Sequence, residues 1–429
     1  MVFLIVRRGI LAPNCTWWKI SDTFLNDASG INYFHQLNKK YGPIAPINIW
    51  GTRLYLVMDV SMIKEILDGS PNVFNVGKLK YDFFKSFMKD NVGVSSGCPW
   101  KRRRQTNEMV LFTDDFHIYS QRYHQYIYQL VSEQNNIATS WDFNTYSDMG
   151  TKLAMRVVFN DPTYPKRGQL FQMFTEANSL SSLIFGKTDM NIEIEKNYYN
   201  YLNENIQNPL SGSLVELSVR NGLTSHEILH QIPHWMFPIG GLINTSVPRL
   251  LTLLCNNLNS LEKLIRILKQ YSEDELKNSK SIVSIKYLRY CILETLRLNN
   301  PVVTTFRKVE TDYVFNNGVE ISKGTQLMIL NNPILRDESF FVKPNEFIPE
   351  RWSNDIEGEY NVIMFNQGPQ RCPGKELAIF LLSSFIVNFF VVCGILKNNQ
   401  FTCSKKIGKN VPQMINPCSL EIIVNKSHD

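Results

Sequence analysis

The sequence predicts a mainly helical protein with small β-sheets at its edge. Between residues 100 and 300, apolar residues recur at spacings of three and four, which is typical of helices that bury one face. The strand-like runs are short and bounded by turn residues, as in residues 44–58, where we expect a hairpin around Gly51. The sequence shows no internal repeat and no linker, so we expect residues 1–429 to form a single domain.

Three parts follow one another along the chain. Asp59 precedes a helical stretch, residues 60–67, within an N-terminal part that otherwise alternates strands and turns. We expect this β-rich part to span residues 1–70 and a helical part to span residues 71–300. The remainder, residues 301–429, should hold short strands, a cysteine-bearing loop, a core helix and the C-terminal strands.

Two long helices are expected in the helical part. Thr224 and Glu227 have the spacing of a capping box and should begin the first helix, which stays apolar to about residue 258. Three prolines lie inside this helix, so it should be kinked or locally unwound. The second helix should span residues 284–298 and end before an Asn-Asn-Pro turn.

Composition excludes several classes of protein. At 429 residues with 44% hydrophobic and 12% aromatic content, the chain can bury a large core and is not intrinsically disordered. The net charge is only +6 and no long basic tract is present, so we predict no nucleic-acid partner. The eight cysteines include no C-x-x-C pair, which argues against a zinc ribbon or a thioredoxin-type site.

Two apolar runs bear on localisation. The first six residues are apolar but two arginines follow, so this run is too short for a signal peptide or a membrane anchor. Residues 377–396 contain no charge and have the length of a membrane span, but Ser383, Ser384 and Asn388 interrupt them. We expect a buried core helix there. The protein should therefore be cytoplasmic or peripherally membrane-associated.

The sharpest motif is F-N-Q-G-P-Q-R-C-P-G-K-E-L-A at residues 365–378, a Gly- and Pro-rich loop that leads into the apolar run. It presents Cys372 at the start of a helix, where N–H groups and the helix dipole favour a thiolate. Gly368 and Gly374 would let the backbone approach a large planar group closely. A lone thiolate without a second metal ligand nearby suits axial ligation of heme iron, whereas the default for the other cysteines is an inert thiol.

The pattern F-x-x-G-x-x-x-C-x-G in this loop resembles the heme-binding loop of cytochromes P450. Phe365, Gly368, Cys372 and Gly374 occupy its fixed positions. The resemblance implies the cytochrome P450 fold over nearly the whole chain, heme b as cofactor and Cys372 as the ligand of its iron.

Two further motifs extend the resemblance. Glu294 and Arg297 match the family's E-x-x-R, and residues 344–352, P-N-E-F-I-P-E-R-W, match its P-x-x-F-x-P-E-R-W. By this resemblance, Glu294, Arg297 and Arg351 form a structural lock behind the heme loop.

The resemblance also implies which residues bind the heme propionates. Trp100 and Arg104 match the family's W-x-x-x-R and share one helical face at a spacing of four. Arg307 resembles a second propionate-binding Arg. The usual loop Arg is a Gln here and Arg371 follows one residue later, which leaves a rearranged propionate pairing open. The remaining cations of residues 101–103 should form a docking patch for an acidic redox protein.

The helix that faces oxygen in the family departs from the norm. In place of A-G-x-[D/E]-T-T, residues 240–245 read G-G-L-I-N-T, so Gly241 is kept, Ile243 replaces the acid and Asn244 replaces the key Thr. Ile243 cannot relay a proton, and Asn244 can donate a hydrogen bond but is a poor relay. Thr245 lies about 100° further around the helix and should point away from the iron unless a nearby proline shifts the register. Gly241, Asn244 and Thr245 are the candidate catalytic residues, and this Asn-Thr pair is similar to that of the sterol 7-alpha- and 12-alpha-hydroxylase and prostacyclin synthase branch.

Three functions remain open, of which the first is the main prediction. A heme-thiolate monooxygenase would insert one atom of O₂ into an apolar, lipid- or sterol-like substrate with electrons from a separate reductase or ferredoxin. A P450-fold isomerase or dehydratase would instead act on a lipid peroxide without external electrons. A non-catalytic heme-binding protein would act as a sensor or carrier. Four apolar segments are candidate walls of the substrate pocket, namely residues 73–94, 170–185, 239–244 and 302–306.

Overall fold

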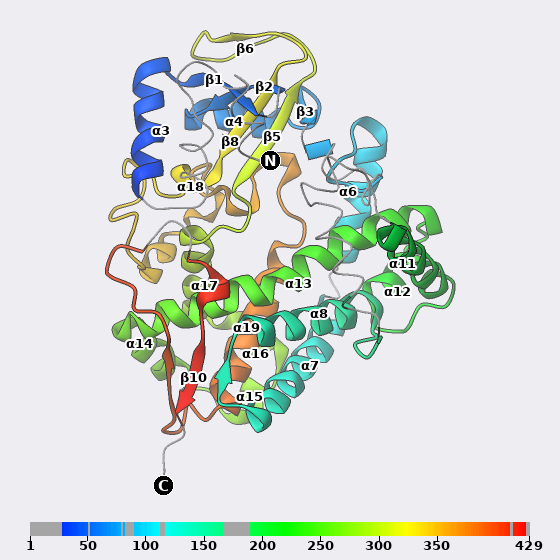
Figure 1. Ribbon diagram of the computed structural model, residues 1–429, viewed down its shortest axis with the longest axis vertical. Helices are drawn as coiled ribbons and strands as arrows, with labels where there is room; N and C mark the ends of the chain where they lie inside the picture. Colours follow the sequence, from blue (N-terminus) through cyan, green and yellow to red (C-terminus); the bar gives the residue numbers. More distant parts are fainter. Residues whose placement is uncertain are drawn as a thin grey trace. The chain divides into compact units, whose positions relative to one another are not determined.

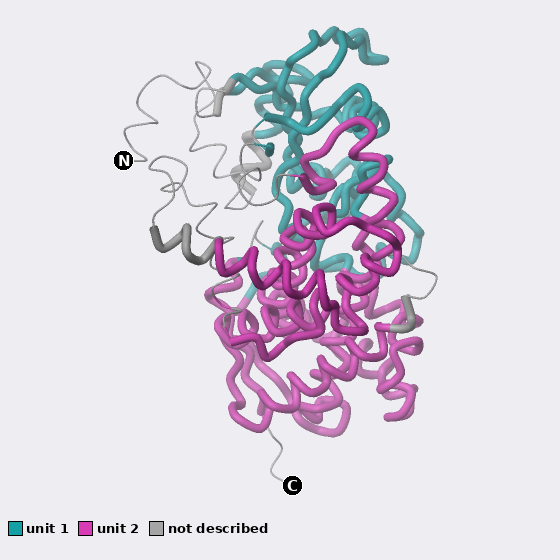
Figure 2. The backbone as a smooth tube through the Cα atoms, turned by 90° about the vertical axis from the view of Figure 1, so that its right-hand side faces the viewer, with its two compact units in different colours: residues 1–81, 293–372, 407–415 teal, residues 82–292, 373–406, 416–429 magenta. Residues whose placement is uncertain are grey.

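The computed structural model describes residues 28–49, 52–78, 80–81, 90–111, 116–165, 168, 189–411 and 415–425. The chain divides into two compact units, each assembled from stretches far apart in the sequence (Figure 2). Unit 1 comprises residues 1–81, 293–372 and 407–415, and unit 2 comprises residues 82–292, 373–406 and 416–429. That the whole chain forms a single domain stays a prediction.

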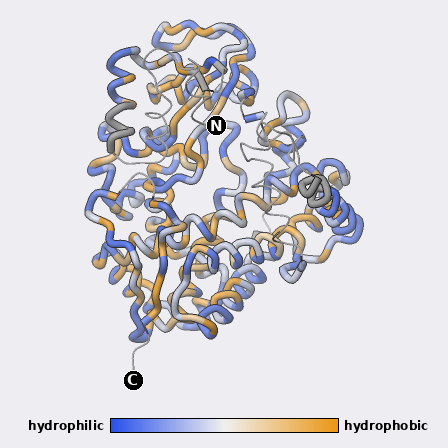
Figure 3. Tube along the Cα trace, in the orientation of Figure 1, coloured by the Kyte–Doolittle hydropathy of each residue, from blue (hydrophilic) through white to orange (hydrophobic). Residues whose placement is uncertain are grey.

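Unit 1 is built on a five-stranded sheet with the strand order β1-β2-β8-β5-β3 (Figure 1). The antiparallel hairpin of β1 (Ile44–Ile49) and β2 (Thr52–Val57) confirms the sequence prediction, and every residue of β1 is paired. β8 (Gln326–Leu330) runs parallel to β2 and antiparallel to β5 (Thr304–Val309). β3 (Phe74–Val76) closes the other edge, antiparallel to β5. The strands are hydrophobic where they are buried, as the colour of β8 shows in Figure 3.

A helix that the sequence analysis missed packs on this sheet. We expected strands and turns throughout residues 1–70, but α3 (Ala28–Tyr41) is helical. Most of its residues are polar and its apolar stripe is narrow, so the helical periodicity was too weak to recognise. The stripe joins the sheet in one buried cluster, which comprises Phe34, Leu37, Ala45, Ile47, Leu54, Leu56, Met58, Met328 and Leu330.

Shorter elements complete unit 1. The expected helix after Asp59 is confirmed as α4 (Val60–Asp68), and the Asp59 carboxylate accepts a hydrogen bond from the Met62 N–H at 2.9 Å. The others are β6 (Tyr313–Val314), β7 (Glu320–Ile321), α18 (Asn331–Ile334) and the 3₁₀ helices η1 (Pro349–Asn354), η2 (Ile356–Gly358), η3 (Ile363–Phe365) and η4 (Gly368–Gln370).

Unit 2 is helical, and its longest helix is α13 (Ser225–Cys255). The predicted capping box is confirmed, since the Thr224 side chain and Glu227 exchange hydrogen bonds. The helix is continuous through its three prolines, so of the two expected alternatives local unwinding is wrong, and a kink stays a prediction. α8 (Phe143–Phe159) packs closely on α13. A Cβ at Gly150 of α8 would lie only 2.4 Å from the carbonyl oxygen of Gly240 of α13.

The apolar run of the sequence becomes a core helix of unit 2, as predicted. Among the described residues, α19 (Lys375–Val392) is the helix that is long and apolar enough to cross a membrane, and 72% of it is buried. It packs along α7 (Phe116–Ile137), and Trp141 places its ring edge-to-face against Phe389 at 5.2 Å. This packing explains an apolar composition all round the helix.

The remaining elements of unit 2 surround these helices. Its small sheet has the order β4-β10-β9. α17 (Lys286–Leu298) ends where predicted, and its residues from 293 on belong to unit 1. The others are α6 (Gly97–Leu111), α11 (Asp189–Gln207), α12 (Leu214–Arg220), α14 (Leu258–Leu268), α15 (Glu273–Leu276), α16 (Ser279–Ser284), β4 (Ser140–Trp141), β9 (Gln400–Cys403), η5 (Pro417–Ser419) and β10 (Ile422–Asn425).

Candidate functional site

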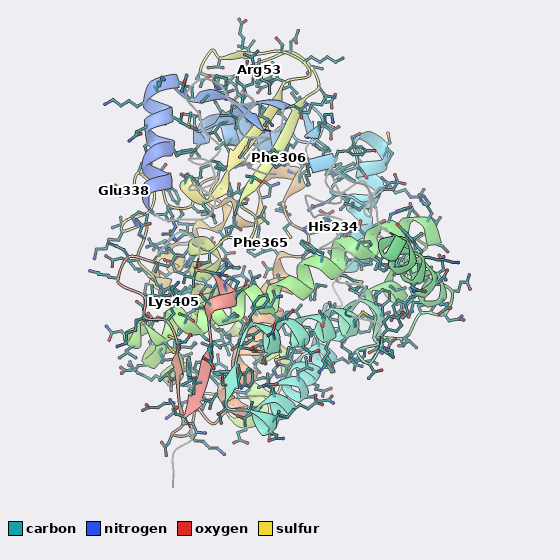
Figure 4. The ribbon with its side chains drawn as sticks, in the orientation of Figure 1. Arg53, His234, Phe306, Glu338, Phe365 and Lys405 are labelled. Carbon is teal, nitrogen blue, oxygen red and sulfur yellow. The ribbon has the colours of Figure 1, made fainter. Side chains whose placement is uncertain are left out.

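Hydrogen bonds within unit 1 shape the loop that carries Cys372. The Cys372 N–H donates to the carbonyl of Phe365 at 2.7 Å and closes the loop on itself. Gln367 Nε2 donates to three backbone carbonyls within residues 357–362, at 2.9–3.2 Å. Cys372 is half-buried in this position, and Figure 4 labels Phe365 at the other end of the loop. The loop is therefore a fixed turn that positions one thiol.

The two loop glycines lie in different surroundings. Gly368 has φ +68°, and a Cβ there would lie 2.5 Å from the carbonyl oxygen of Leu67. The position therefore requires glycine for its close approach to the backbone of α4, and the expected approach of both glycines to a planar group stays a prediction. A Cβ at Gly374 would meet only Leu111, at 3.8 Å, so packing among the described residues does not demand a glycine. Arg371, between the two, is exposed.

Glu294 is the centre of the predicted lock, and it is fully buried. Arg297 donates to both of its carboxylate oxygens, from Nε at 2.8 Å and from Nη2 at 2.9 Å. Arg351 Nε, the Ile348 N–H and Trp352 Nε1 each add a hydrogen bond at 3.0 Å. The structure thus brings the three predicted residues together and adds Trp352, whose indole the sequence motif contained without assigning it a partner.

The lock carries more positive charge than the sequence motifs indicated. Burial alone would raise the pKa of Glu294, but the charges of Arg297 and Arg351 lower it overall. Arg336 lies fully buried nearby, where it donates to the Leu298 carbonyl at 2.7 Å. Burial and the charge of Arg297 lower the pKa of Arg336 to about 9. No motif spacing marked Arg336, so only the structure reveals it.

Arg307 is a buried cation of the kind that binds an anionic ligand. Its Nε donates to Ser70 Oγ and its Nη1 to the Phe306 carbonyl, both at 2.9 Å. Burial lowers the pKa of Arg307 to about 10, and burial together with the charge of Arg307 lowers that of Lys80 to about 8. Among the described residues no carboxylate forms an ion pair with either cation. The sequence analysis found Arg307 and missed Lys80.

Trp100 and Arg104 are both buried on α6, in unit 2. Arg104 Nε donates to Glu108 at 2.7 Å, and the expected role of Arg104 at a propionate stays a prediction. The neighbouring cations are less available than expected. Arg102, although exposed, forms an ion pair with Glu227 at 2.7 Å, and Arg103 forms one with Asp90 at 3.7 Å. Lys101 is then the exposed cation of the predicted patch that has no ion pair with the described residues.

The residues of the oxygen-side motif on α13 differ in burial. Ile243 is fully buried, and its Cβ lies 3.5 Å from the position that a Cβ would take at Gly150 of α8. Gly241, Asn244 and Thr245 are only half-buried. The position that holds an acid in the family therefore faces a helix contact in this chain.

The half-buried residues Asn244 and Thr245 differ in their hydrogen bonding. The Asn244 Oδ1 atom is buried and accepts no hydrogen bond from the described residues. The Asn244 carbonyl also lacks the usual helical donor, because residue 248 is a proline without an N–H. Thr245 donates its hydroxyl proton to the Gly241 carbonyl at 2.6 Å. Asn244 therefore has an open acceptor, whereas the hydroxyl of Thr245 is engaged.

The predicted site residues are divided between the units. Unit 1 holds Cys372 with Phe365, Gly368 and Arg371, the lock and Arg307, whereas unit 2 holds Gly374, Trp100, Arg104 and the three candidate catalytic residues of α13. Of the predicted pocket walls, residues 82–89 and 170–185 lie outside the described residues.

Comparison with known proteins decides the family. A model of cytochrome P450 matches residues 172–398, more than half of the chain. The chain belongs to the cytochrome P450 family. It is 24% identical over 425 residues to probable cytochrome P450 4p3 of Drosophila melanogaster, which covers 85% of this chain and 81% of that protein.

Other members of the family match over shorter stretches of this P450. Cytochrome P450 85A2 of Arabidopsis thaliana is 32% identical over 174 residues, 39% of this chain and 37% of that protein. Fusicoccadiene C-8 hydroxylase of Alternaria brassicicola is 29% identical over 132 residues, 30% of this chain and 25% of that protein. These relatives support an oxidoreductase that incorporates oxygen, a monooxygenase at the level of the family.

P450 proteins bind heme b through a cysteine thiolate, and the residues present fit that group. Cys372 is a half-buried thiol on a fixed loop. Arg307 and Lys80 are cations for which the described residues supply no carboxylate, and heme b carries two carboxylates. The donor set thus matches both the iron and the propionates.

Proposed function

We propose that this P450 is a heme-thiolate monooxygenase that inserts one atom of O₂ into an apolar, lipid- or sterol-like substrate. Cys372 is its iron ligand, and electrons come from a separate reductase or ferredoxin. The observation that carries the proposal is the closed loop that presents the Cys372 thiol, in a chain of the P450 family.

The other residues have supporting roles in this proposal. Heme, when bound, supplies the iron at which O₂ is activated. Arg307 and Lys80 of unit 1 hold and neutralise its propionates. For Trp100 and Arg104, binding of a propionate is what the family resemblance implies. The lock around Glu294 keeps the loop in place. Asn244 offers the open acceptor for a hydrogen bond from a substrate, a water molecule or a protonated oxygen.

Substrate, partner and location belong to the same proposal. The apolar composition of residues 239–244 and 302–306 supports a lipid- or sterol-like substrate. We propose a single heme domain over residues 1–429 and a cytoplasmic or peripherally membrane-associated protein. A reductase or ferredoxin with an acidic surface would dock near Lys101, since Arg102 and Arg103 are already paired.

A carbon monoxide difference spectrum of the reduced, heme-loaded protein tests the assignment of Cys372. Wild type should give the spectrum of a thiolate-ligated heme, Cys372→Ser should lose it, and Cys98→Ser, which changes an exposed cysteine, should keep it. A thiolate spectrum in Cys372→Ser would overturn the assignment. Turnover is tested by oxygen-dependent NADPH consumption with a reductase and an apolar substrate.

A second function is favoured by the chemistry of α13. Neither an acid nor a hydroxyl stands at the family's usual positions, since these are Ile243 and Asn244. This supports an isomerase or dehydratase that acts on a lipid peroxide without external electrons. The likeness of the Asn-Thr pair to the sterol hydroxylase and prostacyclin synthase branch is compatible with both functions, since that branch includes hydroxylases and an isomerase. Turnover of a lipid hydroperoxide without reductase would single it out. Inactivity in both assays would leave a heme-binding sensor or carrier.

A further inference from the structure

Three side chains with metal-binding atoms meet on unit 2, outside the site described above. His226 and His230 lie on α13, and Asp90 lies beside both. The Asp90 Oδ2 atom is 3.7 Å from Nε2 of His226 and 3.9 Å from Nε2 of His230. One ligand atom from each residue lies within 4.8 Å of the other two. We propose that Asp90, His226 and His230 form a binding site for a divalent transition metal ion, Zn²⁺ in the first instance.

The helix prearranges two of the three ligands. His226 and His230 are four residues apart, so their imidazoles leave the same face of α13, and their ring centroids are 4.7 Å apart. Two imidazoles at this spacing are a known way for a helix to bind zinc. A carboxylate oxygen completes a set of two nitrogens and one oxygen, which suits Zn²⁺ and leaves its fourth position to water.

The surroundings leave the site accessible and orient its carboxylate. The exposed fractions of the His226, Asp90 and His230 side chains are 64%, 33% and 14%, so an ion can enter from solvent. The other oxygen of Asp90 faces Arg103, 3.7 Å away, so that Oδ2 remains turned towards the histidines. Ion ligands are commonly oriented by such an outer contact.

The site is a binding site and not a hydrolytic centre. Glu227, next to His226, is the residue that would serve as general base in a zinc hydrolase with this spacing. Its carboxylate is instead held by the Thr224 backbone N–H at 2.9 Å and by Arg102 at 2.7 Å. The charge of Glu227 also offsets part of the positive potential at the start of α13, which would oppose a cation.

A bound metal would fasten the segment before α6 to α13. Residues 90–95 already contact this helix, because the Val92 N–H donates to Gln231 Oε1 at 3.2 Å. Gly93 lies against His234, which Figure 4 labels on α13. Coordination of Asp90 would add a third contact between this segment and α13. We therefore expect Zn²⁺ to slow amide hydrogen exchange in residues 90–95.

Equilibrium dialysis of the heme-loaded, full-length protein against ZnCl₂, followed by metal analysis, tests the proposal. Wild type should retain about one more zinc ion per chain than His226→Ala or Asp90→Asn, with affinity lowered at least about 10-fold in either variant. His35→Ala is the matched control, since it removes an exposed histidine of unit 1. Equal zinc retention by wild type and both variants would overturn the proposal, because cysteines or other histidines would then hold the metal.

A second measurement needs no variant. Diethyl pyrocarbonate modifies exposed imidazoles, and peptide mass spectrometry reports each histidine separately. Zn²⁺ should protect His226 and His230 several-fold and leave His35 unprotected. Equal modification of His226 with and without zinc would refute the site even if a variant had failed to fold.

Discussion

Arg297 donates hydrogen bonds to both carboxylate oxygens of Glu294, from Nε at 2.8 Å and from Nη2 at 2.9 Å, and both side chains are completely buried. The same guanidinium donates through Nη1 to the carbonyls of Leu335 and Pro344 at 2.8 and 2.7 Å. One residue of α17 thus joins a carboxylate to two loops of unit 1. This arrangement indicates a structural role rather than a catalytic one.

Glu294→Ala should therefore prevent accumulation of folded holoprotein. It leaves two arginines without their shared carboxylate, and removing one partner of a buried ion pair costs about 3–5 kcal/mol. Glu346→Ala is the control, because the ion pairs of Glu346 within the described part of the chain are with exposed lysines and their loss should cost at most about 1 kcal/mol. The measurements are soluble yield, heme content and urea unfolding. Normal yield and heme content in Glu294→Ala, with loss of turnover alone, would show that the structural role is wrong.

Gly368→Ala should destabilise unit 1 more than its backbone angle alone predicts. A positive φ costs a non-glycine residue about 1–2 kcal/mol, and the new Cβ would also collide with the Leu67 carbonyl. Gly324→Ala separates the two effects, since Gly324 has φ +86° and open space around it. Urea unfolding should show a larger loss for Gly368→Ala. Equal losses would mean that the loop shifts away from α4 without cost.

His124 should make the stability of unit 2 depend on pH. Its Nε2 contacts the Leu276 carbonyl at 3.0 Å and its Nδ1 the Ser384 hydroxyl at 2.6 Å, which suits a neutral ring protonated at Nε2. Burial lowers the pKa of His124 from 6.5 to about 4. Because the unfolded chain takes up the proton first, this contribution is complete above pH 6.5 and is lost as the pH falls towards 4.

The expected loss is about 2 kcal/mol between pH 7 and pH 5, where carboxylates remain ionised. Urea unfolding at several pH values measures it. His124→Gln should flatten the dependence over this range, and His35→Gln, at an exposed position, should not. An unchanged slope in His124→Gln would assign the pH dependence to other groups.

Local spacing identified the Cys372 loop and the Glu294–Arg297 pair, because the residues of each lie within a few positions of one another. That Arg351, from a separate motif, joins this pair was implied by the family resemblance and not by spacing. Arg336 and Lys80 could not be found in this way, since their partners come from distant segments and their spacing is not fixed. The contact of Gly368 with Leu67 is equally non-local. His226 and His230 have a visible spacing, but nothing in the sequence brings Asp90 to them.

The packing of α13 is a further feature that sequence spacing does not reveal. This helix is apolar on most sides, so its sequence does not reveal which side packs on α8. By the family pattern, Ile243→Asp restores the missing acid and should improve proton delivery. In the structure, Ile243 is completely buried against Gly150, so a carboxylate there would lose its contact with water.

Ile243→Asp should consequently lower stability by at least about 3 kcal/mol, or hold its carboxyl group neutral. Leu242→Asp is the matched control, because Leu242 is the half-buried neighbour on the same helix and should cost less. Thermal unfolding of the two variants decides between them. An Ile243→Asp protein as stable as Leu242→Asp would show that position 243 can reach water.

Asn244→Thr should change the amount of product that is formed per NADPH consumed. If Asn244 limits proton delivery, wild type couples NADPH consumption poorly to product and releases hydrogen peroxide. A threonine places a hydroxyl at the family's usual position, so the product formed per NADPH consumed should rise. Asn221→Thr, at the exposed end of α12, should leave this ratio unchanged.

The opposite result is expected if the protein rearranges a lipid peroxide. The Asn244 amide would then hydrogen-bond to the peroxide directly, and Asn244→Thr would lower turnover in the absence of reductase. The two assays on one variant therefore distinguish the two functions. A variant that matches wild type in both would show that the open Oδ1 acceptor of Asn244 takes no part in the reaction, and the proton path would then have to run through other groups on α13.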